Sequence, residues 1–277
     1  MKIAFKIPPI IEDISASHLL VELSNDEVCF LIFSKTDFTL QGYYLYELNK
    51  NILAIEYAEE LKMIIQDEGI FHQSYTSVQV CYNFTASTLV PKDFFVEAEK
   101  ENMLELIFGR DASTYCFYED VLDNDMKIVY RVSSKIYETV NELFPENKFS
   151  HASSMQLQAN KFEMDTLQCM VYHNSIKLIL YKNGKLQIAQ FFDYETPIDV
   201  SYHLLNVCER FSVFPSEVKL ILNGMIVEKS NLFDDIHKYF LNVQFATLPT
   251  DVIVSEDMKE HPTHFYHNLT ALAQCVS

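Results

Sequence analysis

The sequence predicts a mixed α/β protein made of two related halves, each with the element order βββαβαβ. Strand-like runs joined by short polar turns precede an amphipathic helix at two places in the 277-residue chain. Corresponding strands and helices of the two halves lie 148, 147 and 140 residues apart, which indicates a duplicated fold. Hydrophobic residues make up 49% of the chain, a share that is typical of a folded protein with a substantial core.

The first half starts with a predicted antiparallel meander of three strands, in which Asn25-Asp26 forms the first turn. Apolar residues three and four positions apart then predict a helix, and strands and a second helix follow. In chain order, the predicted elements are strands 19–24, 27–34 and 38–48, helix 52–69, strand 77–83, helix 134–144 and strand 149–153.

A segment of about residues 84–126 interrupts this first unit as an inserted subdomain with a helix over 93–108 and a strand over 114–120. The strand 127–132 fits the insertion and the main sheet equally well. A helix over 153–162 joins the halves without a Gly- or Ser-rich linker. We therefore expect a first domain over 1–155 and a second domain over 156–277.

The second half repeats the same order of strands and helices. Its first helix has a clear start, with the hydroxyl of Thr196 as the cap, Pro197 in the first turn and Asp199 at the third position. The predicted elements are strands 166–173, 176–182 and 185–194, the helix after Thr196, strand 217–222, helix 230–240, strand 243–247 and a C-terminal helix over 263–275.

Charge and composition exclude several classes of function. The chain has 21 basic and 39 acidic residues, so its net charge of −18 disfavours nucleic acid and anionic lipid as partners. No apolar run approaches the length of a membrane span, and the start does not have the pattern of a secretory signal. The six cysteines form no CxxC pair. We expect a cytoplasmic protein with free thiols.

No catalytic or metal motif is present. A Walker A loop, a GxGxxG fingerprint and a GxSxG elbow are all missing, and the chain has only five glycines. We interpret the acidic runs around 97–101 and 119–125 as solvated faces. Cys81 and His72 are interpreted as a buried thiol and an unrelated histidine rather than as a catalytic pair. His261, His264 and His267 have helical spacing but no further ligand, so we interpret them as ordinary helix residues.

The order of the elements, with several local sequences, resembles the actin-like ATPase superfamily of duplicated ribonuclease-H-like domains. Within it, the chain is most similar to a family of uncharacterised bacterial proteins related in fold to PilM of type IV pilus assembly and the cytoplasmic part of the type II secretion protein GspL. The local likenesses are Ser77-Val78-Gln79-Val80-Cys81-Tyr82, the helix 97–108, Tyr118-Glu119-Asp120-Val121-Leu122 and the closing residues 265–272.

The resemblance implies a nucleotide site formed by a turn after the first strand of each domain and by a Gly-rich adenosine loop. The corresponding residues here are Ser24, Asn25 and Asp26 in the first turn, Asn174 and Ser175 in the second, and Asn223 and Gly224 in the third. The first turn has no Asp-x-Gly sequence, the second has neither an acid nor a glycine, and the third has one glycine. The resemblance thus implies the fold, with degenerate nucleotide loops.

Our leading hypothesis is a non-catalytic actin-like protein that acts as a scaffold or protein-interaction module, with a protein partner and no cofactor. The alternative is a divergent actin-like ATPase that binds ATP and Mg²⁺ through the same turns. A third hypothesis, a ribonuclease-H-like nuclease, requires three or four acids at one end of the sheet, and only Glu22 lies on a first strand.

Overall fold

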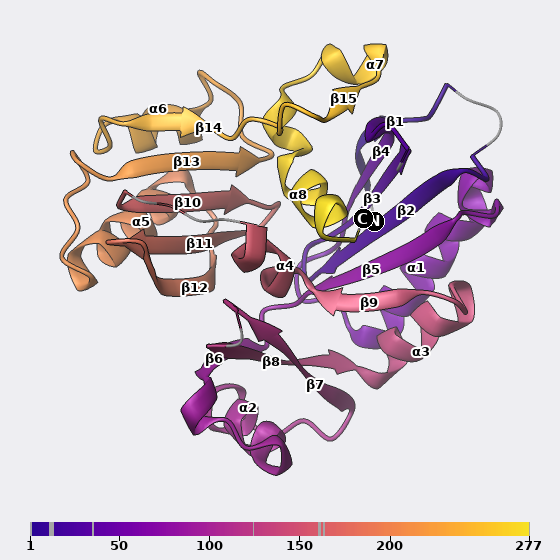
Figure 1. Cartoon of the computed structure of the whole chain (residues 1–277), viewed down its shortest axis with the longest axis horizontal. Helices are drawn as coiled ribbons and strands as arrows, with labels where there is room; N and C mark the ends of the chain where they lie inside the picture. The colour runs from indigo at the N-terminus through magenta and orange to yellow at the C-terminus, as the bar shows by residue number, and fades with distance from the viewer. Residues whose placement is uncertain are drawn as a thin grey trace. The chain divides into compact units, whose positions relative to one another are not determined.

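The computed structural model describes residues 2–10, 14–34, 36–123, 125–159, 162 and 164–276 (Figure 1). The chain divides into two compact units. The first contains Met1–Ala159, Asp251–Met258 and Ala271–Ser277, and the second contains Asn160–Thr250 and Lys259–Thr270. None of the described helices is long and apolar enough to cross a lipid bilayer.

The first unit has a mixed sheet with the strand order β1-β4-β3-β2-β5-β9, to which β15 adds by pairing with β4. The strands are β1 (Lys2–Ile7), β2 (Ser17–Ser24), β3 (Glu27–Ser34), β4 (Thr39–Glu47), β5 (Ser77–Asn83), β9 (Lys148–His151) and β15 (Ile253–Val254). β2, β3 and β4 form the antiparallel meander, whereas β5 and β9 extend it as parallel strands. This is the βββαβαβ order that the sequence predicts.

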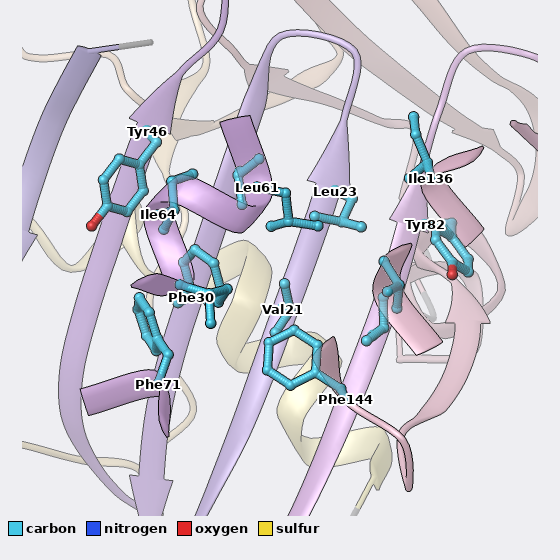
Figure 2. Close-up of a cluster of buried hydrophobic side chains, with 14 of the residues drawn as sticks. Val21, Leu23, Phe30, Tyr46, Leu61, Ile64, Phe71, Tyr82, Ile136 and Phe144 are labelled. Atoms are coloured by element: carbon cyan, nitrogen blue, oxygen red, sulfur yellow. The ribbon is translucent and has the colours of Figure 1, made fainter. Parts of the chain in front are cut away.

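Two helices cover one face of this sheet. Helix α1 (Ala54–Asp67) connects β4 to β5 through the short helix η1 (Gly69–His72), and α3 (Ser134–Leu143) precedes β9. α1 begins where a Glu56 carboxylate oxygen accepts the Leu53 N–H at 3.3 Å. Its inward side chains and those of α3 pack on the sheet in a continuous apolar core (Figure 2). The labelled members include Val21, Leu23, Phe30, Leu61, Ile64, Phe71, Ile136 and Phe144.

The inserted subdomain is a three-stranded antiparallel sheet with the order β6-β8-β7. Its elements are β6 (Ser87–Pro91), η2 (Lys92–Phe94), η3 (Glu97–Glu99), α2 (Lys100–Phe108), β7 (Thr114–Val121) and β8 (Met126–Ser133). β8 pairs with both β6 and β7, so the strand that the sequence left open belongs to the small sheet. This sheet extends to Ser133, where the chain enters α3 directly.

The second unit repeats the architecture, with the strand order β12-β11-β10-β13-β14. The elements are β10 (Thr166–Val171), β11 (Ser175–Lys182), β12 (Lys185–Asp193), α5 (Pro197–Arg210), β13 (Lys219–Gly224), α6 (Asn231–His237) and β14 (Val243–Phe245). β10, β11 and β12 are antiparallel, and β13 and β14 continue the sheet in parallel. At the start of α5, an Asp199 oxygen accepts the Thr196 N–H at 2.8 Å, as the sequence predicts.

The remaining elements are α4 (Ala152–Ala159), α7 (Glu256–Lys259), η4 (Thr263–Phe265) and α8 (His267–Val276). Several expectations differ in detail from the structure, and the helix expected over 263–275 is divided into η4 and α8. The helix expected over 93–108 contains two short 3-10 turns before α2, because Phe95 and Val96 have extended backbones. The helix expected over 153–162 is seen as α4, and residues 160, 161 and 163 lie outside the described residues. The sequence does not predict the strands β1, β6 and β15 or the helix α7.

The first core gives a direct test of the packing. Phe30 is fully buried and its ring stacks on Phe71 with centroids 4.1 Å apart. Replacing it by Ala (F30A) is expected to lower the free energy of unfolding by about 3–5 kcal/mol, because the cavity in the sheet–helix core cannot collapse fully. The matched control F94A removes a ring that is 74% exposed and should change stability by less than about 0.5 kcal/mol. Urea unfolding of both variants measures the difference, and equal losses would contradict the packing.

Candidate functional site

The first turn, between β2 and β3, is closed by its own side chains. Ser24 Oγ accepts the backbone N–H groups of Asp26 and Glu27 at 3.3 and 3.0 Å, and its hydroxyl donates to the Glu27 carbonyl oxygen at 3.2 Å. Asn25 Oδ1 accepts the N–H of Thr85, at the start of the inserted subdomain, at 2.9 Å. Two backbone amides of the turn are therefore directed at Ser24.

A buried carboxylate lies just before this turn. Glu22 on β2 is 2% exposed, and Asn83 Nδ2, at the end of the parallel neighbour β5, donates to its Oε1 at 2.5 Å. Asp26 and Glu27 are also buried, at 8% and 5%. The sequence singled out Glu22 but did not predict Asn83 as its partner.

The thiol beside this carboxylate is held protonated. Cys29 is the residue opposite Glu22 on β3, and Tyr43 on β4 donates its hydroxyl toward the Cys29 sulfur at 4.0 Å. Burial, followed by the nearby carboxylates Glu27 and Glu22, raises the pKa of the Cys29 thiol well above its ordinary value. A protonated buried thiol is a poor nucleophile, so Cys29 has the properties of a core residue.

The other described cysteines have similar properties. All five described cysteines are free thiols, and Cys116 alone among them is half-buried. Burial raises the pKa of Cys169 to about 12 and that of Cys208 to about 11. Cys81 contacts sulfur and hydroxyl groups, with Met155 Sδ at 3.5 Å and Ser150 Oγ at 4.0 Å. The side chain of Cys275 lies outside the described residues.

The second turn, between β10 and β11, places aromatic side chains where the family resemblance implies a phosphate loop. The Tyr172 N–H donates to the Ser175 carbonyl at 2.9 Å, and the Asn174 carbonyl accepts the N–H of Tyr194 at 3.0 Å. The Tyr194 hydroxyl also donates to the Tyr172 carbonyl at 2.8 Å, and Asn268 Nδ2 donates to the Tyr172 hydroxyl at 3.2 Å. Ser175 is buried, at 4%.

The third turn lies beside the second, at the same end of the sheet. β13 runs parallel to β10, and Gly224 is the register partner of Val171. Gly224 has φ +80°, and a Cβ on it would lie 2.3 Å from the Val171 carbonyl oxygen. Backbone packing within this unit thus accounts for this glycine. The structure brings Asn174, Ser175, Asn223 and Gly224 to one end of the second unit's sheet.

Asn223 differs from the other turn residues. Its side chain is fully buried, and neither amide atom has a hydrogen-bond partner among the residues that the structure describes. A buried amide without hydrogen-bond partners lowers stability, and both amide atoms of Asn223 could still form hydrogen bonds.

A half-buried carboxylate connects the inserted subdomain to the main sheet. Glu119 on β7 accepts the Tyr130 hydroxyl at 2.6 Å, the His151 N–H at 2.7 Å and the Ser154 hydroxyl. The expectation of a solvated face is wrong for Glu119, although Asp120 beside it is exposed. Successive side chains of a strand point to opposite faces, so Glu119 and Asp120 differ in exposure. This alternation could be recognised in the sequence.

Two histidines of the C-terminal region, His264 and His267, are at least partly buried. His264 is buried, with its Nε2 2.6 Å from the Ile226 carbonyl oxygen and its ring stacked on Phe245. Burial lowers the pKa of His264 and of His267, which favours the neutral rings. Within the described ranges, no three His, Cys, Asp or Glu side chains gather closely enough to hold a metal ion.

Gly224 provides a test of the third turn. G224A is expected to lower the free energy of unfolding by at least about 2 kcal/mol, because the new methyl group meets the Val171 backbone and an L-residue is strained at this φ. In the control G69A, the added methyl group has nothing within 4 Å and should leave stability unchanged or slightly raised. Thermal unfolding compares the two, and a neutral G224A would contradict the close approach.

Glu119 predicts a pH effect. Burial raises the pKa of Glu119 despite three hydrogen bonds, so the folded state favours the protonated carboxyl. The stability that the protonated carboxyl contributes is lost as the pH rises through the raised pKa of the folded state. E119Q does not titrate and retains an acceptor oxygen. The stability of E119Q relative to the wild type should therefore increase from about pH 4 to pH 7. E146Q, which replaces an exposed carboxylate, controls for the loss of one charge. Parallel E119Q and wild-type curves in urea titrations would disprove the effect.

Comparisons with known proteins agree with the architecture. A family model described as "Protein of unknown function (DUF3822)" matches residues 10–243. No curated protein sequence matches the chain. Among solved structures, a protein from Bacteroides thetaiotaomicron VPI-5482, described as having an actin-like ATPase fold and unknown function, is 19% identical with a TM-score of 0.75 over 95% of this chain and 97% of that chain.

Two further solved structures come from assembly systems. The PilM–PilN type IV pilus biogenesis complex is 12% identical with a TM-score of 0.64, over 95% of this chain and 99% of that chain. The cytoplasmic domain of EpsL, an inner membrane component of the Vibrio cholerae type II secretion system, is 13% identical with a TM-score of 0.48, over 94% and 95%. At these identities, the similarities to the Bacteroides protein and to the PilM–PilN structure establish the fold alone, which is the actin-like ATPase fold.

Proposed function

The chain belongs to the DUF3822 family of proteins of unknown function, and from this premise we propose that it is a non-catalytic actin-like protein that acts as a scaffold or protein-interaction module. The observation that supports this most strongly is the first turn. Ser24 Oγ already accepts the Asp26 and Glu27 amides that would face a phosphate. A nucleotide would have to displace these contacts and approach the buried carboxylate of Glu22.

The second turn supports the same proposal. Phosphate loops use glycine because the backbone must approach the ligand without a Cβ. Here Tyr172 and Tyr194 hold the turn through a hydroxyl–carbonyl hydrogen bond of 2.8 Å, and no glycine is present. Two tyrosines thus brace this turn, which contains no glycine.

A partner-binding role is consistent with the exposed surface of the inserted subdomain. Phe94 and Leu106 are 74% and 88% exposed, and Ile107 is 59% exposed. Large apolar side chains that remain in contact with water are characteristic of interaction surfaces when several lie on one subdomain. The PilM–PilN structure, which has the same fold, is itself a complex of two proteins. We propose a protein partner, and the acidic charge argues against nucleic acid.

We also place the protein in the cytoplasm. The five described cysteines are free thiols, of which four are buried. Free thiols persist in the reducing cytoplasm, whereas proteins of oxidising compartments commonly contain disulfides.

Asn223 favours a second candidate, a divergent ATP-binding protein. Both of its amide atoms lack a partner in the described part of the chain, and it immediately precedes Gly224 in the third turn. A ligand that entered this end of the second unit could satisfy the amide. This candidate requires Asn223 to be a binding residue, whereas the scaffold proposal requires no ligand at this position.

The two candidates are separated by nucleotide titration of the full chain. Under the scaffold proposal, calorimetry with Mg-ATP up to millimolar concentration gives no binding heat, and phosphate release stays at background. N223L removes the unpaired amide and should leave the midpoint of thermal unfolding unchanged or raised, with or without Mg-ATP. Micromolar binding, turnover, or a thermal shift by Mg-ATP that N223L abolishes would overturn the scaffold proposal in favour of the ATP-binding candidate.

A further inference from the structure

The outer face of α1 has apolar side chains in contact with solvent. Ile55 is 59% exposed and Met63 is 52% exposed. Ile55, Glu59 and Met63 are spaced four residues apart, so they form one stripe along the helix. The inward face, which includes Leu61 and Ile64, is buried in the core on the opposite side of the helix (Figure 2). The outer face of α1 therefore carries two exposed apolar side chains beside its carboxylates, whereas the outer face of an ordinary surface helix is mainly polar.

A hollow of about 550 Å³ lies along this outer face. All of its lining residues belong to α1 and the turn before it, so the hollow lies within the first unit. Its apolar members are Ile52, Ile55 and Met63, and its carboxylates are Glu56, Glu59 and Glu60.

The charge around the hollow has one sign. α1 contains four acidic residues and one basic residue, Lys62. Lys62 Nζ lies 3.0 Å from a Glu142 oxygen on α3, so its charge is already directed at a carboxylate. Glu59 stands between the two exposed apolar side chains in the stripe. The hollow thus combines an apolar floor with a negative rim.

We infer that this hollow binds a cationic amphipathic helix of a partner protein. The inference rests on the proposed interaction function and names the chemistry of the partner. Apolar side chains of the partner would cover Ile55 and Met63, and flanking Lys or Arg side chains would pair with Glu56 and Glu59. The opposite charges speed the encounter, and the apolar contact slows dissociation.

Other occupants of the hollow are disfavoured by the same charges. A second copy placed by a two-fold axis would bring identical carboxylates against one another. An anionic lipid surface would likewise be repelled by Glu56 and Glu59. Only a partner that supplies positive charge beside an apolar face satisfies both features of the hollow.

The test uses the full chain and a labelled synthetic 18-residue helix with leucines on one face and lysines on its flanks. We expect anisotropy titrations to show binding that weakens as NaCl rises from about 50 to 300 mM. The double variant I55S/M63S should weaken binding about tenfold or more, because it removes the apolar floor. E59Q should weaken binding at low salt and flatten the salt dependence. Methyl NMR should show shifts at Ile52, Ile55 and Met63.

Matched controls separate this site from general attraction between opposite charges. I198S removes a 69% exposed side chain from α5, the corresponding helix of the second unit, and should leave the affinity unchanged. A scrambled peptide of equal composition and a peptide with glutamate in place of lysine should not bind. No binding of the amphipathic peptide, equal binding of the scrambled peptide, or full affinity in I55S/M63S would overturn the inference.

The remaining occupants are outcomes of the same experiment. The protein could instead float with phosphatidylglycerol vesicles or self-associate in sedimentation. If I55S/M63S loses either property, a lipid surface or a second copy occupies the hollow, and the inference is overturned. Thermal unfolding of I55S/M63S confirms that the variant is folded. If the peptide does not bind, the inference about the hollow fails and the nucleotide results are unaffected. If Mg-ATP is turned over, the scaffold proposal fails and the peptide measurement is unaffected. The two failures are therefore distinguishable.

Discussion

Both units depend on a first strand that is buried along its whole length. All eight residues of β2 and all six of β10 are buried, and each strand has an antiparallel neighbour on one side and a parallel neighbour on the other. Such a strand must satisfy its polar side chains inside the protein, because water cannot reach them. His18 Nδ1 lies 2.7 Å from Ser77 Oγ, and Glu22 is bonded to Asn83. These pairs also fix the register between β2 and β5.

The same constraint positions the candidate turns. The first and second turns begin where a fully buried strand ends, so the sheet sets their positions. Ser24 then completes the first turn, and the Gly224–Val171 contact completes the third.

The sequence predicted most of the fold because its strongest patterns are local. The meander 19–48 and the start of α5 at Thr196 each carry a turn or cap signal next to a periodic apolar run. β1 and β6 escaped prediction because their residues are mostly exposed or half-buried, so they have no continuous apolar run. Their pairing partners lie far along the chain, where periodicity gives no information.

The candidate site was predictable in position but not in its contacts. The turns follow from the strand order, so Ser24, Asn174 and Gly224 could be located. The partners of Glu22 and Glu119 could not, since they lie 61 and 35 residues away in the sequence at Asn83 and Ser154. An acid inside a strand pattern signals that a partner must exist, without saying which residue supplies it. Only the pairing of strands decides that.

The exposed face of α1 shows why burial and charge must be considered together. Single exposed apolar residues are common on protein surfaces and need no explanation. On α1, Ile55 and Met63 share a stripe with Glu59 while the opposite face is fully used by the core. The core of the first unit does not include Ile55 or Met63, so core packing does not account for the apolar character of the stripe. A partner that contributes positive charge explains the apolar stripe and its acidic rim together, whereas core packing explains neither.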